Sequence, residues 1–284
     1  MMLLEASIGD AYGRVFEYAD DTFVTAFNTA ENYIKRKNEE TPVGRYTDDA
    51  QMSLAIAEAL IIGDWSPSVL VEHFFQAFKR DERTGYAKRF YRLLKEVKTS
   101  GELLERLTNQ TGPGSDKSGA SMRACPIGVL PSIGDVLQKS RIQAVITHNS
   151  TDGQNAAMAA SLLTHYCLYN LGPKADVGCF IQDYVNGPWS APWVGPVGEK
   201  GWQSVRAAIT VVSESKTMRE VLKRSIAFTG DVDTVATIAC ATAAHCREIE
   251  NDLPKTFYDN LENGTYGRDY IADIDRKLMS LVNN

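Results

Sequence analysis

Apolar residues recur at helical spacing along most of this chain, and this periodicity restricts its fold more than any other feature. The clearest helical pattern starts at residue 50 and ends at Gly63, a residue type that often follows the last helical turn. Pro67 is expected at the first position of the next helix. Further helices are expected at residues 84–97, 118–131, 151–170, 201–212, 216–227, 234–248 and 267–281.

Strand candidates are few, and Val145-Ile146-Thr147 is too short to anchor a sheet. The chain shows no alternation of strands with helices, no internal repeat and no polar linker. We therefore expect a helical protein with a single domain over residues 1–284.

One segment, residues 185–201, interrupts the helical pattern. Pro188, Pro192 and Pro196 exclude a continuous helix there. Trp189 and Trp193 could pack this segment onto the body of the protein or stack on an aromatic ligand, and packing is the favoured interpretation.

Charge and cysteine content narrow the possible partners and compartment. The net charge of −6 argues against an extended nucleic-acid footprint or binding to an anionic membrane. The five cysteines form no CxxC pair, the first residues do not resemble a signal peptide, and no apolar run is long enough to span a bilayer. These features predict a reduced, cytoplasmic protein.

Two acidic clusters each precede an apolar helical stretch, at Thr47-Asp48-Asp49 and at Asp231-Val232-Asp233-Thr234. Taken singly, each is best explained as a capped helix start with favourable macrodipole charges, Thr47 being a good N-cap. Together they offer four carboxylates and two hydroxyls, a donor set that suits two octahedral cations such as Mg²⁺ or Mn²⁺. Gathering these carboxylates without a cation would cost several kcal/mol, so a shared metal site is the alternative.

A glycine-rich stretch runs from Gly112 to Arg123 and leads into the predicted helix at residues 118–131. It is neither a Walker A loop nor a dinucleotide-binding fingerprint, since Ala120 follows Gly119 and no strand precedes it. Backbone amides at such a helix start can bind an anion, and a flexible loop is the equal alternative. Glu17 and His148 are uninformative when taken alone.

In combination, these elements resemble the ADP-ribosylglycohydrolase family, which includes the dinitrogenase-reductase-activating glycohydrolases. The resemblance rests on the order of five motifs over about four-fifths of the chain. In this sequence they are Gly9-Asp10-x-x-Gly13-x-x-x-Glu17, Thr47-Asp48-Asp49, Gly114-Ser115-x-x-x-Gly119-Ala120-x-Met122-Arg123-x-x-Pro126, Thr147-His148, and Gly230-Asp231-x-Asp233-Thr234.

The resemblance implies an all-α orthogonal bundle with a binuclear Mg²⁺ or Mn²⁺ centre at the base of a cleft. The implied metal ligands are Thr47, Asp48, Asp49, Asp231, Asp233 and Thr234. The implied diphosphate loop comprises Gly114, Ser115, Asp116, Ser118 and Gly119. His148 would contact the distal ribose or phosphate region, and Glu17 corresponds to a mobile acidic residue that approaches the metals in some members.

The sequence departs from the family pattern mainly in this loop. The family commonly has Gly-Asn-Gly-Ala-Ala-Met-Arg, whereas Lys117 and Ser118 replace the first Gly and the Asn here. Asp116 stands where some members have an aromatic residue, and it would repel a diphosphate unless it turned away or met a metal or Lys117. Ala50 stands where a Thr often follows the two aspartates, a change expected to remove no ligand.

The implied reaction is metal-dependent hydrolysis of the glycosidic bond between ADP-ribose and an acceptor. Glu17 or Asp48 would orient or deprotonate the attacking water, whose pKa a bound metal lowers. The acceptor stays open among arginine, serine, a nucleic-acid base and a free nucleotide. Two alternatives also stay open, a non-catalytic ADP-ribose-binding or structural member and a hydrolase of another ribosylated small molecule. We expect a monomer or a small homo-oligomer.

Overall fold

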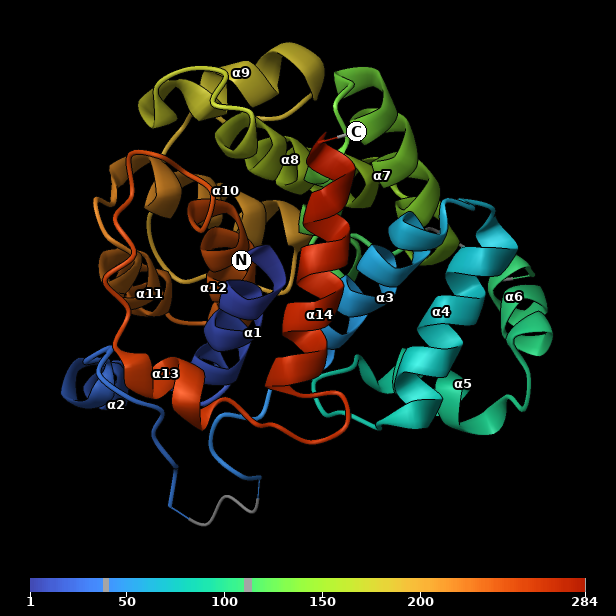
Figure 1. Cartoon of the computed structure of the whole chain (residues 1–284), viewed down its shortest axis with the longest axis horizontal. Coiled ribbons are helices and arrows are strands. Elements are labelled where there is room, and N and C mark those ends of the chain that lie inside the picture. The colour runs from blue at the N-terminus through green and yellow to red at the C-terminus, as the bar shows by residue number, and fades with distance from the viewer. Residues whose placement is uncertain (38–40, 110–113, 284) are drawn as a thin grey trace.

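The computed structural model describes residues 1–37, 41–109 and 114–283, and all of its extended regular elements are helices. Within that part of the chain, β-structure is limited to isolated bridges such as Val197 with Gly230. The expected all-α fold is therefore confirmed (Figure 1). None of the helices in these residues combines the length and apolar character that crossing a bilayer requires.

The helices occur in the following order along the chain. They are α1 (Met2–Gly13), α2 (Asp21–Phe27), α3 (Asp48–Ile62), α4 (Pro67–Arg80), α5 (Lys88–Glu96), α6 (Ser100–Thr108), α7 (Ile133–Thr147), α8 (Thr151–Leu168), α9 (Val177–Tyr184), α10 (Gly201–Glu214), α11 (Met218–Ala227), α12 (Val232–Ala243), α13 (Lys255–Asn260) and α14 (Arg268–Met279). Short 3₁₀ helices are η1 (Ser118–Ala120), η2 (Cys125–Val129), η3 (Lys174–Asp176) and η4 (Ser280–Asn283).

A central group of helices holds the core, and the others surround it. Helices α1, α3, α12 and α14 lie in the middle of the molecule, with α4, α5 and α6 on one side and α9, α10 and α11 on the other (Figure 1). Helix α1 makes its largest interhelical contact with α12, and α3 packs against α4 and α14. Every residue of α1 is buried, as expected for a helix surrounded by others.

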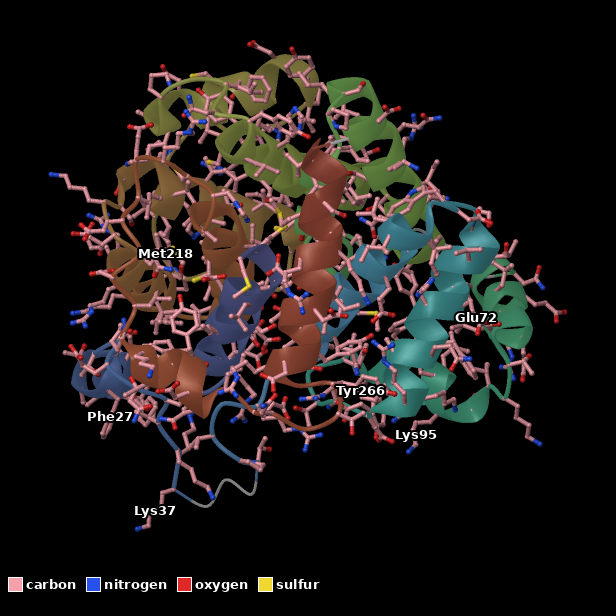
Figure 2. All side chains as sticks on the ribbon, in the orientation of Figure 1. Phe27, Lys37, Glu72, Lys95, Met218 and Tyr266 are labelled. Atoms are coloured by element: carbon pink, nitrogen blue, oxygen red, sulfur yellow. The ribbon has the colours of Figure 1, made fainter. Side chains whose placement is uncertain are left out.

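The outer helices bury one face only. In α4, Leu70, Phe74 and Phe78 repeat every four residues and are buried. Figure 2 shows the side chains between the helices, with Lys37 and Lys95 projecting from the edge of the molecule. All five cysteines are free, and four of them are buried, so most act as small apolar residues.

One local prediction is wrong, and one weak strand candidate is helical. Residues 118–131 form the short 3₁₀ helices η1 and η2 in place of one α-helix, because Pro126 cannot donate a backbone hydrogen bond in a helix interior. Val145-Ile146-Thr147 lies in α7 rather than in a strand. These three β-branched residues belong to the last turn of a 15-residue helix.

Helix positions are otherwise close to expectation, with shifts at the ends. Helix α5 begins at Lys88 where residue 84 was expected, and α12 begins at Val232 and ends at Ala243 where 234–248 was expected. The pattern missed the helices that are short or rich in small and polar residues. These are α1, α2, α6, α7, α9 and α13.

The segment at residues 185–200 is irregular, as predicted, and α10 begins at Gly201. Trp189 is only 2% exposed and donates its indole N–H to the carbonyl of Val185 at 3.0 Å, so this tryptophan packs the segment onto the body. The segment also reaches the second acidic cluster. Val197 donates to the carbonyl of Thr229 and accepts from the backbone N–H of Asp231, both at 2.9 Å.

Candidate metal centre

Two glycines on one face of α1 bring this helix against the start of α12. A Cβ atom at Gly13 would lie 2.5 Å from the Cα of Asp233, and one at Gly9 would overlap the carbonyl of Ala236. Only glycine permits so close an approach of two helix backbones. The spacing Gly9-x-x-x-Gly13 therefore places the segment after α1, which carries Glu17, beside Asp233.

Asp10, also on α1, caps the start of α3. Its carboxylate accepts hydrogen bonds from the backbone N–H groups of Thr47 and Ala50, both at 2.9 Å, and from the Thr47 hydroxyl at 2.8 Å. A buried carboxylate from another helix thus satisfies the free N–H groups of α3. Sequence reasoning missed this role of Asp10, although the residue belongs to the Gly-Asp-x-x-Gly motif.

The predicted capping by the clusters' own residues is wrong in detail. Thr47 occupies the N-cap position of α3 without a capping side-chain hydrogen bond, because its hydroxyl is directed to Asp10. Asp231 occupies the N-cap position of α12 and likewise makes no capping bond. Helix capping thus does not explain why Asp48 and Asp231 are aspartates.

A glycine also makes room for the Asp48 side chain. Gly85 has a φ of +104°, and a Cβ atom there would overlap the Asp48 Oδ1 atom. The neighbouring Thr84 accepts the backbone N–H of Asp48 at 3.1 Å. The turn before α5 therefore fixes both the backbone and the carboxylate of Asp48.

The two acidic clusters meet in the folded chain. The Thr237 hydroxyl of α12 donates to the carbonyl of Asp233 at 2.8 Å. The Thr237 hydroxyl lies 3.5 Å from the Asp49 Oδ2 atom. Side chains almost 190 residues apart in the sequence therefore line one site.

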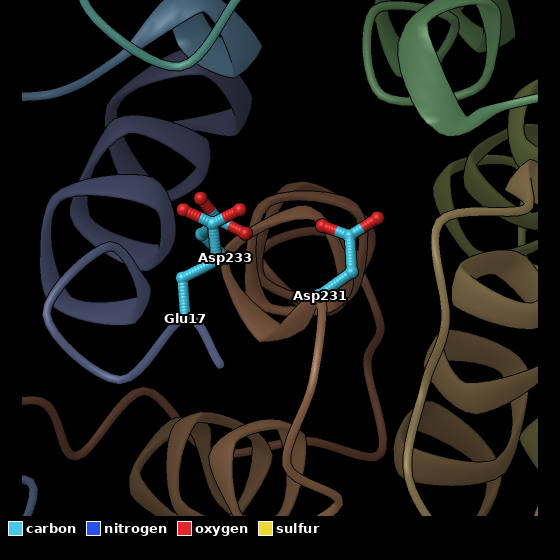
Figure 3. Close-up of side chains that lie close together, drawn as sticks. All are labelled: Glu17, Asp231 and Asp233. Carbon is cyan, nitrogen blue, oxygen red and sulfur yellow. The ribbon is translucent and has the colours of Figure 1, made fainter. Parts of the chain in front are cut away.

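Glu17 joins the second cluster most closely. Each of Glu17, Asp231 and Asp233 offers a carboxylate oxygen, and these oxygens lie within 4.8 Å of one another. Figure 3 shows the three side chains pointing to the same side. In the described residues this is the one acidic group that meets that distance, and Asp48 and Asp49 lie outside it. The structure thus places Glu17 nearer to Asp233 and Asp231 than its sequence position indicated.

Burial raises the pKa of every carboxyl group in this site, and mutual repulsion adds to the effect. The pKa of Asp10 is raised to about 6 by burial, and that of Glu17 to about 7 by burial and by the charges of Asp231 and Asp10. The pKa values of the remaining carboxyl groups are also raised, chiefly by burial. They belong to Asp48, Asp49, Asp231 and Asp233.

This arrangement fits divalent cations. The raised pKa values indicate that these carboxyl groups hold protons more readily than usual, and a bound cation would replace those protons. Carboxylate and hydroxyl oxygens are the ligands that Mg²⁺ and Mn²⁺ prefer. Ser204, which sequence reasoning missed, approaches Asp231 at 3.4 Å from α10 and supports its orientation. The acidic group could therefore hold metal.

The predicted diphosphate loop borders the acidic site at Ser118, because burial raises the pKa of Asp231 and the nearby Ser118 side chain acts against that rise. Asp116 turns to Lys200, with 2.6 Å between carboxylate and ammonium, and the pKa of Asp116 is lowered by this contact. Lys117 pairs with Glu199 instead. The expected repulsion by Asp116 is thus offset by a lysine that the sequence did not single out.

The beginning and end of this loop pack against the His148 region. Gly114 has no room for a Cβ atom beside the backbone of Asn149. The Ser115 carbonyl accepts the Ser150 hydroxyl at 2.7 Å. Gly112 and Pro113 lie outside the described residues. His148 is buried, and a Cβ atom at Gly119 would lie 2.8 Å from its Cε1 atom. Gly114, Ser115 and Gly119 therefore lie against the segment that carries His148.

Comparison with known proteins identifies the family. The model of the ADP-ribosylglycohydrolase family matches residues 1–284. The chain is 30% identical over 175 residues to "ADP-ribosylhydrolase ARH3" of Xenopus tropicalis, covering 58% of this chain and 49% of that protein. It is 28% identical over 176 residues to the Homo sapiens protein of the same name, covering 58% and 48%. The match spans about half the length of these relatives.

A solved structure shares the fold. A chain of an "ADP-ribosylglycohydrolase-related protein complex" superposes with a TM-score of 0.75, covering 99% of this chain and 96% of that one, at 19% sequence identity. The helical arrangement is therefore that of a known structure.

Proposed function

Because this chain belongs to the ADP-ribosylglycohydrolase family, we propose that it hydrolyses the glycosidic bond between ADP-ribose and an acceptor, with two divalent cations bound at the acidic site. The observation that carries the proposal is the meeting of the two acidic clusters, where Thr237 of α12 lies 3.5 Å from Asp49 and where the charge of Asp231 adds to burial in raising the pKa of Asp49. The cations would be held by Thr47, Asp48, Asp49, Asp231, Asp233 and Thr234, with Glu17 close to Asp231 and Asp233. The proposal treats residues 1–284 as one catalytic domain.

Hydrolysis would break the bond between the anomeric carbon of the terminal ribose and the acceptor atom, while a water oxygen forms the new bond. Bound Mg²⁺ or Mn²⁺ would orient the ribose hydroxyls and make water easier to deprotonate. Glu17 is favoured over Asp48 as the group that takes this proton and passes it to the leaving acceptor. Its carboxylate oxygen lies within 4.8 Å of those of Asp231 and Asp233, and cations bound there would keep Glu17 ionised and able to act as a base.

The other carboxylates would stabilise the positive charge that develops on the ribose ring in an oxocarbenium-like transition state. On the far side of the ribose, Gly114, Ser115, Ser118 and Gly119 would line the diphosphate. Asp116 would stay directed at Lys200, which limits its repulsion of the phosphates. His148 would contact the distal ribose or a phosphate.

The test is the release of ADP-ribose from a panel of conjugates linked through arginine, serine and a nucleic-acid base. We expect at least one conjugate to be cleaved in the presence of Mg²⁺ or Mn²⁺, and cleavage to stop in EDTA and to return when metal is added. Full activity of the metal-free protein would refute the metal-dependent reaction. Tight binding of ADP-ribose without cleavage of any conjugate would instead identify a binding protein.

Variants connect the activity to the site. Asp48→Ala and Asp231→Ala should each reduce turnover by more than about a hundredfold, since loss of a residue that only supports a metal ligand already costs about 10- to 100-fold. Asp135→Ala is the matched control, because Asp135 also lies in the first turn of a helix but is exposed and outside the site. Wild-type turnover in either site variant, with metal present, would contradict the proposed site.

A further inference from the structure

A buried arginine lies behind the predicted substrate loop. Arg123 is 2% exposed, and its guanidinium lies 4.5 Å from the ring centroid of Phe74. It donates to the Gln143 side chain at 2.6 Å, to the Gln143 carbonyl at 3.1 Å and to the Thr147 hydroxyl oxygen at 2.8 Å. Among the described residues, no carboxylate forms an ion pair with it. Burying a cation that has only neutral acceptors is costly, and the hydrogen bonds to Gln143 and Thr147 offset part of that cost.

The bond to Thr147 has a fixed direction. A guanidinium has donors and no acceptor, so the Thr147 oxygen accepts from Arg123. The single hydroxyl proton of Thr147 is then free to point to His148, whose Nδ1 atom lies 2.8 Å away. Among the described residues the Thr147 hydroxyl makes no hydrogen bond besides those to Arg123 and His148, so Nδ1 is the one acceptor in reach of its proton. In a neutral imidazole, this places the ring proton on Nε2.

The environment of His148 keeps the ring neutral. Burial lowers its pKa to about 3, and the charge of Arg123 acts in the same direction. The ring edge that carries Nε2 faces the substrate loop. A Cβ atom at Gly119 would lie 3.1 Å from Nε2, and the glycine leaves that space free. The Nε2–H group is thus presented beside the loop that would hold the diphosphate.

We propose that Arg123 is a positioning residue that acts through Thr147 to fix His148 as a neutral donor, with its Nε2–H directed at a phosphate or ribose oxygen of the substrate. The identity of that oxygen rests on the proposed function. The direction of the hydrogen bonds from Arg123 to Thr147 and from Thr147 to His148 does not depend on the proposed function.

The tautomer of His148 can be measured without substrate or turnover. The chain has four histidines, so the His148 ring resonances can be assigned by ¹⁵N–¹H correlation spectra of the wild type and of His148→Gln. We expect Nδ1 to be unprotonated and Nε2 to carry the proton in the wild type at neutral pH. A wild-type ring with its proton on Nδ1, or a charged ring, would overturn the proposal.

Variants of Thr147 separate positioning from general packing. Thr147→Val keeps the shape and removes the hydroxyl, so His148 should populate the Nδ1–H tautomer and the Kd for ADP-ribose should rise roughly tenfold. Thr147→Ser restores the hydroxyl, and both the tautomer and the Kd should return toward wild type. An unchanged His148 tautomer in Thr147→Val would overturn the relay.

The tautomer also distinguishes this proposal from the proposed function. If no conjugate is hydrolysed but the wild-type His148 ring carries its proton on Nε2, the relay stands and the hydrolase assignment fails. If hydrolysis occurs and the ring proton lies on Nδ1, the relay alone is wrong. Should Thr147→Val fail to fold, the wild-type spectrum still decides.

Discussion

At the scale of single residues, the acidic site depends on glycines, which have no side chain, as much as on its carboxylates. Gly9 and Gly13 let α1 approach α12, and Gly85 leaves space for the Asp48 carboxylate. None of these glycines carries chemistry. Each sets the position of a carboxylate that does.

Gly85→Ala should therefore disturb the site more than it disturbs the fold. The new methyl group would overlap Asp48 Oδ1, so metal affinity should fall by at least about tenfold, and turnover with it. Calorimetric titration with Mn²⁺ measures the affinity.

Gly63→Ala is the matched control, since Gly63 also has a positive φ of +85° but no atom within 4 Å of its Cβ position. Both variants should lose about 1 kcal/mol of stability from backbone strain. Equal Mn²⁺ affinities in the two variants would show that Gly85 does not position Asp48.

At the scale of secondary-structure elements, two helices begin on buried carboxylates supplied by a neighbouring helix. Asp10 of α1 caps α3, and Asp275 of α14 caps α1 by accepting from the backbone N–H of Leu3 at 2.8 Å and of Leu4 at 3.2 Å. Burial raises the pKa of both carboxyl groups to about 6. The two aspartates therefore share a structural role and differ in their distance from the acidic site.

This pair gives a matched test of helix positioning. Asp10→Ala and Asp275→Ala should each lower the free energy of unfolding by about 2 kcal/mol, because each leaves buried helix N–H groups without an acceptor. Only Asp10→Ala should also weaken Mn²⁺ binding, since it releases the start of α3 that carries Asp48 and Asp49. Urea unfolding and metal titration of both variants measure these effects. Unaltered Mn²⁺ affinity in Asp10→Ala would show that the cap is purely structural.

The elements were predictable where apolar periodicity was strong and less so elsewhere. Helices α3, α4, α8 and α10 follow directly from their patterns. Helix α1 was missed because it is buried on every side and contains two glycines, so no polar face marks it. The apolar residues after Ser118 predict a helix, but Pro126 cannot continue its hydrogen-bond pattern and only the short helices η1 and η2 form.

The site was partly predictable for a similar reason. The residue types and their order indicated a metal centre, but the sequence could not show which helix caps α3 or that Lys200 pairs with Asp116. Those contacts join residues 37 and 84 positions apart and depend on how the helices pack. The capping explanation for Thr47 was reasonable from local sequence and was overturned by a long-range bond to Asp10.

At the scale of the whole molecule, the cluster couples stability to pH and metal. The folded-state pKa values of Asp10 and Glu17, about 6 and 7, exceed their ordinary values of 3.8 and 4.5. The folded, metal-free protein thus binds more protons than the unfolded chain between about pH 4 and pH 7. These groups contribute fully to stability below their ordinary pKa values of 3.8 and 4.5. That contribution is lost as the pH rises through the folded-state pKa values of about 6 and 7.

The free energy of unfolding of the metal-free protein should therefore fall between pH 5 and pH 7. Saturating Mg²⁺ should reduce that fall, because the cation stabilises the ionised carboxylates of the folded state. Urea unfolding at pH 5, 6 and 7, with Mg²⁺ and with EDTA, measures both effects. A metal-free protein that becomes more stable over this range would contradict the account of the cluster.

The central claim is that two helix starts far apart in the sequence form one binuclear metal centre. Titration of the metal-free protein with Mn²⁺, followed by electron paramagnetic resonance, tests it most directly. Two ions should bind per chain and give a spin-coupled spectrum, because paired metals of this kind lie about 3.5–4 Å apart. A single bound ion with an uncoupled six-line spectrum, or no bound ion, would contradict the claim.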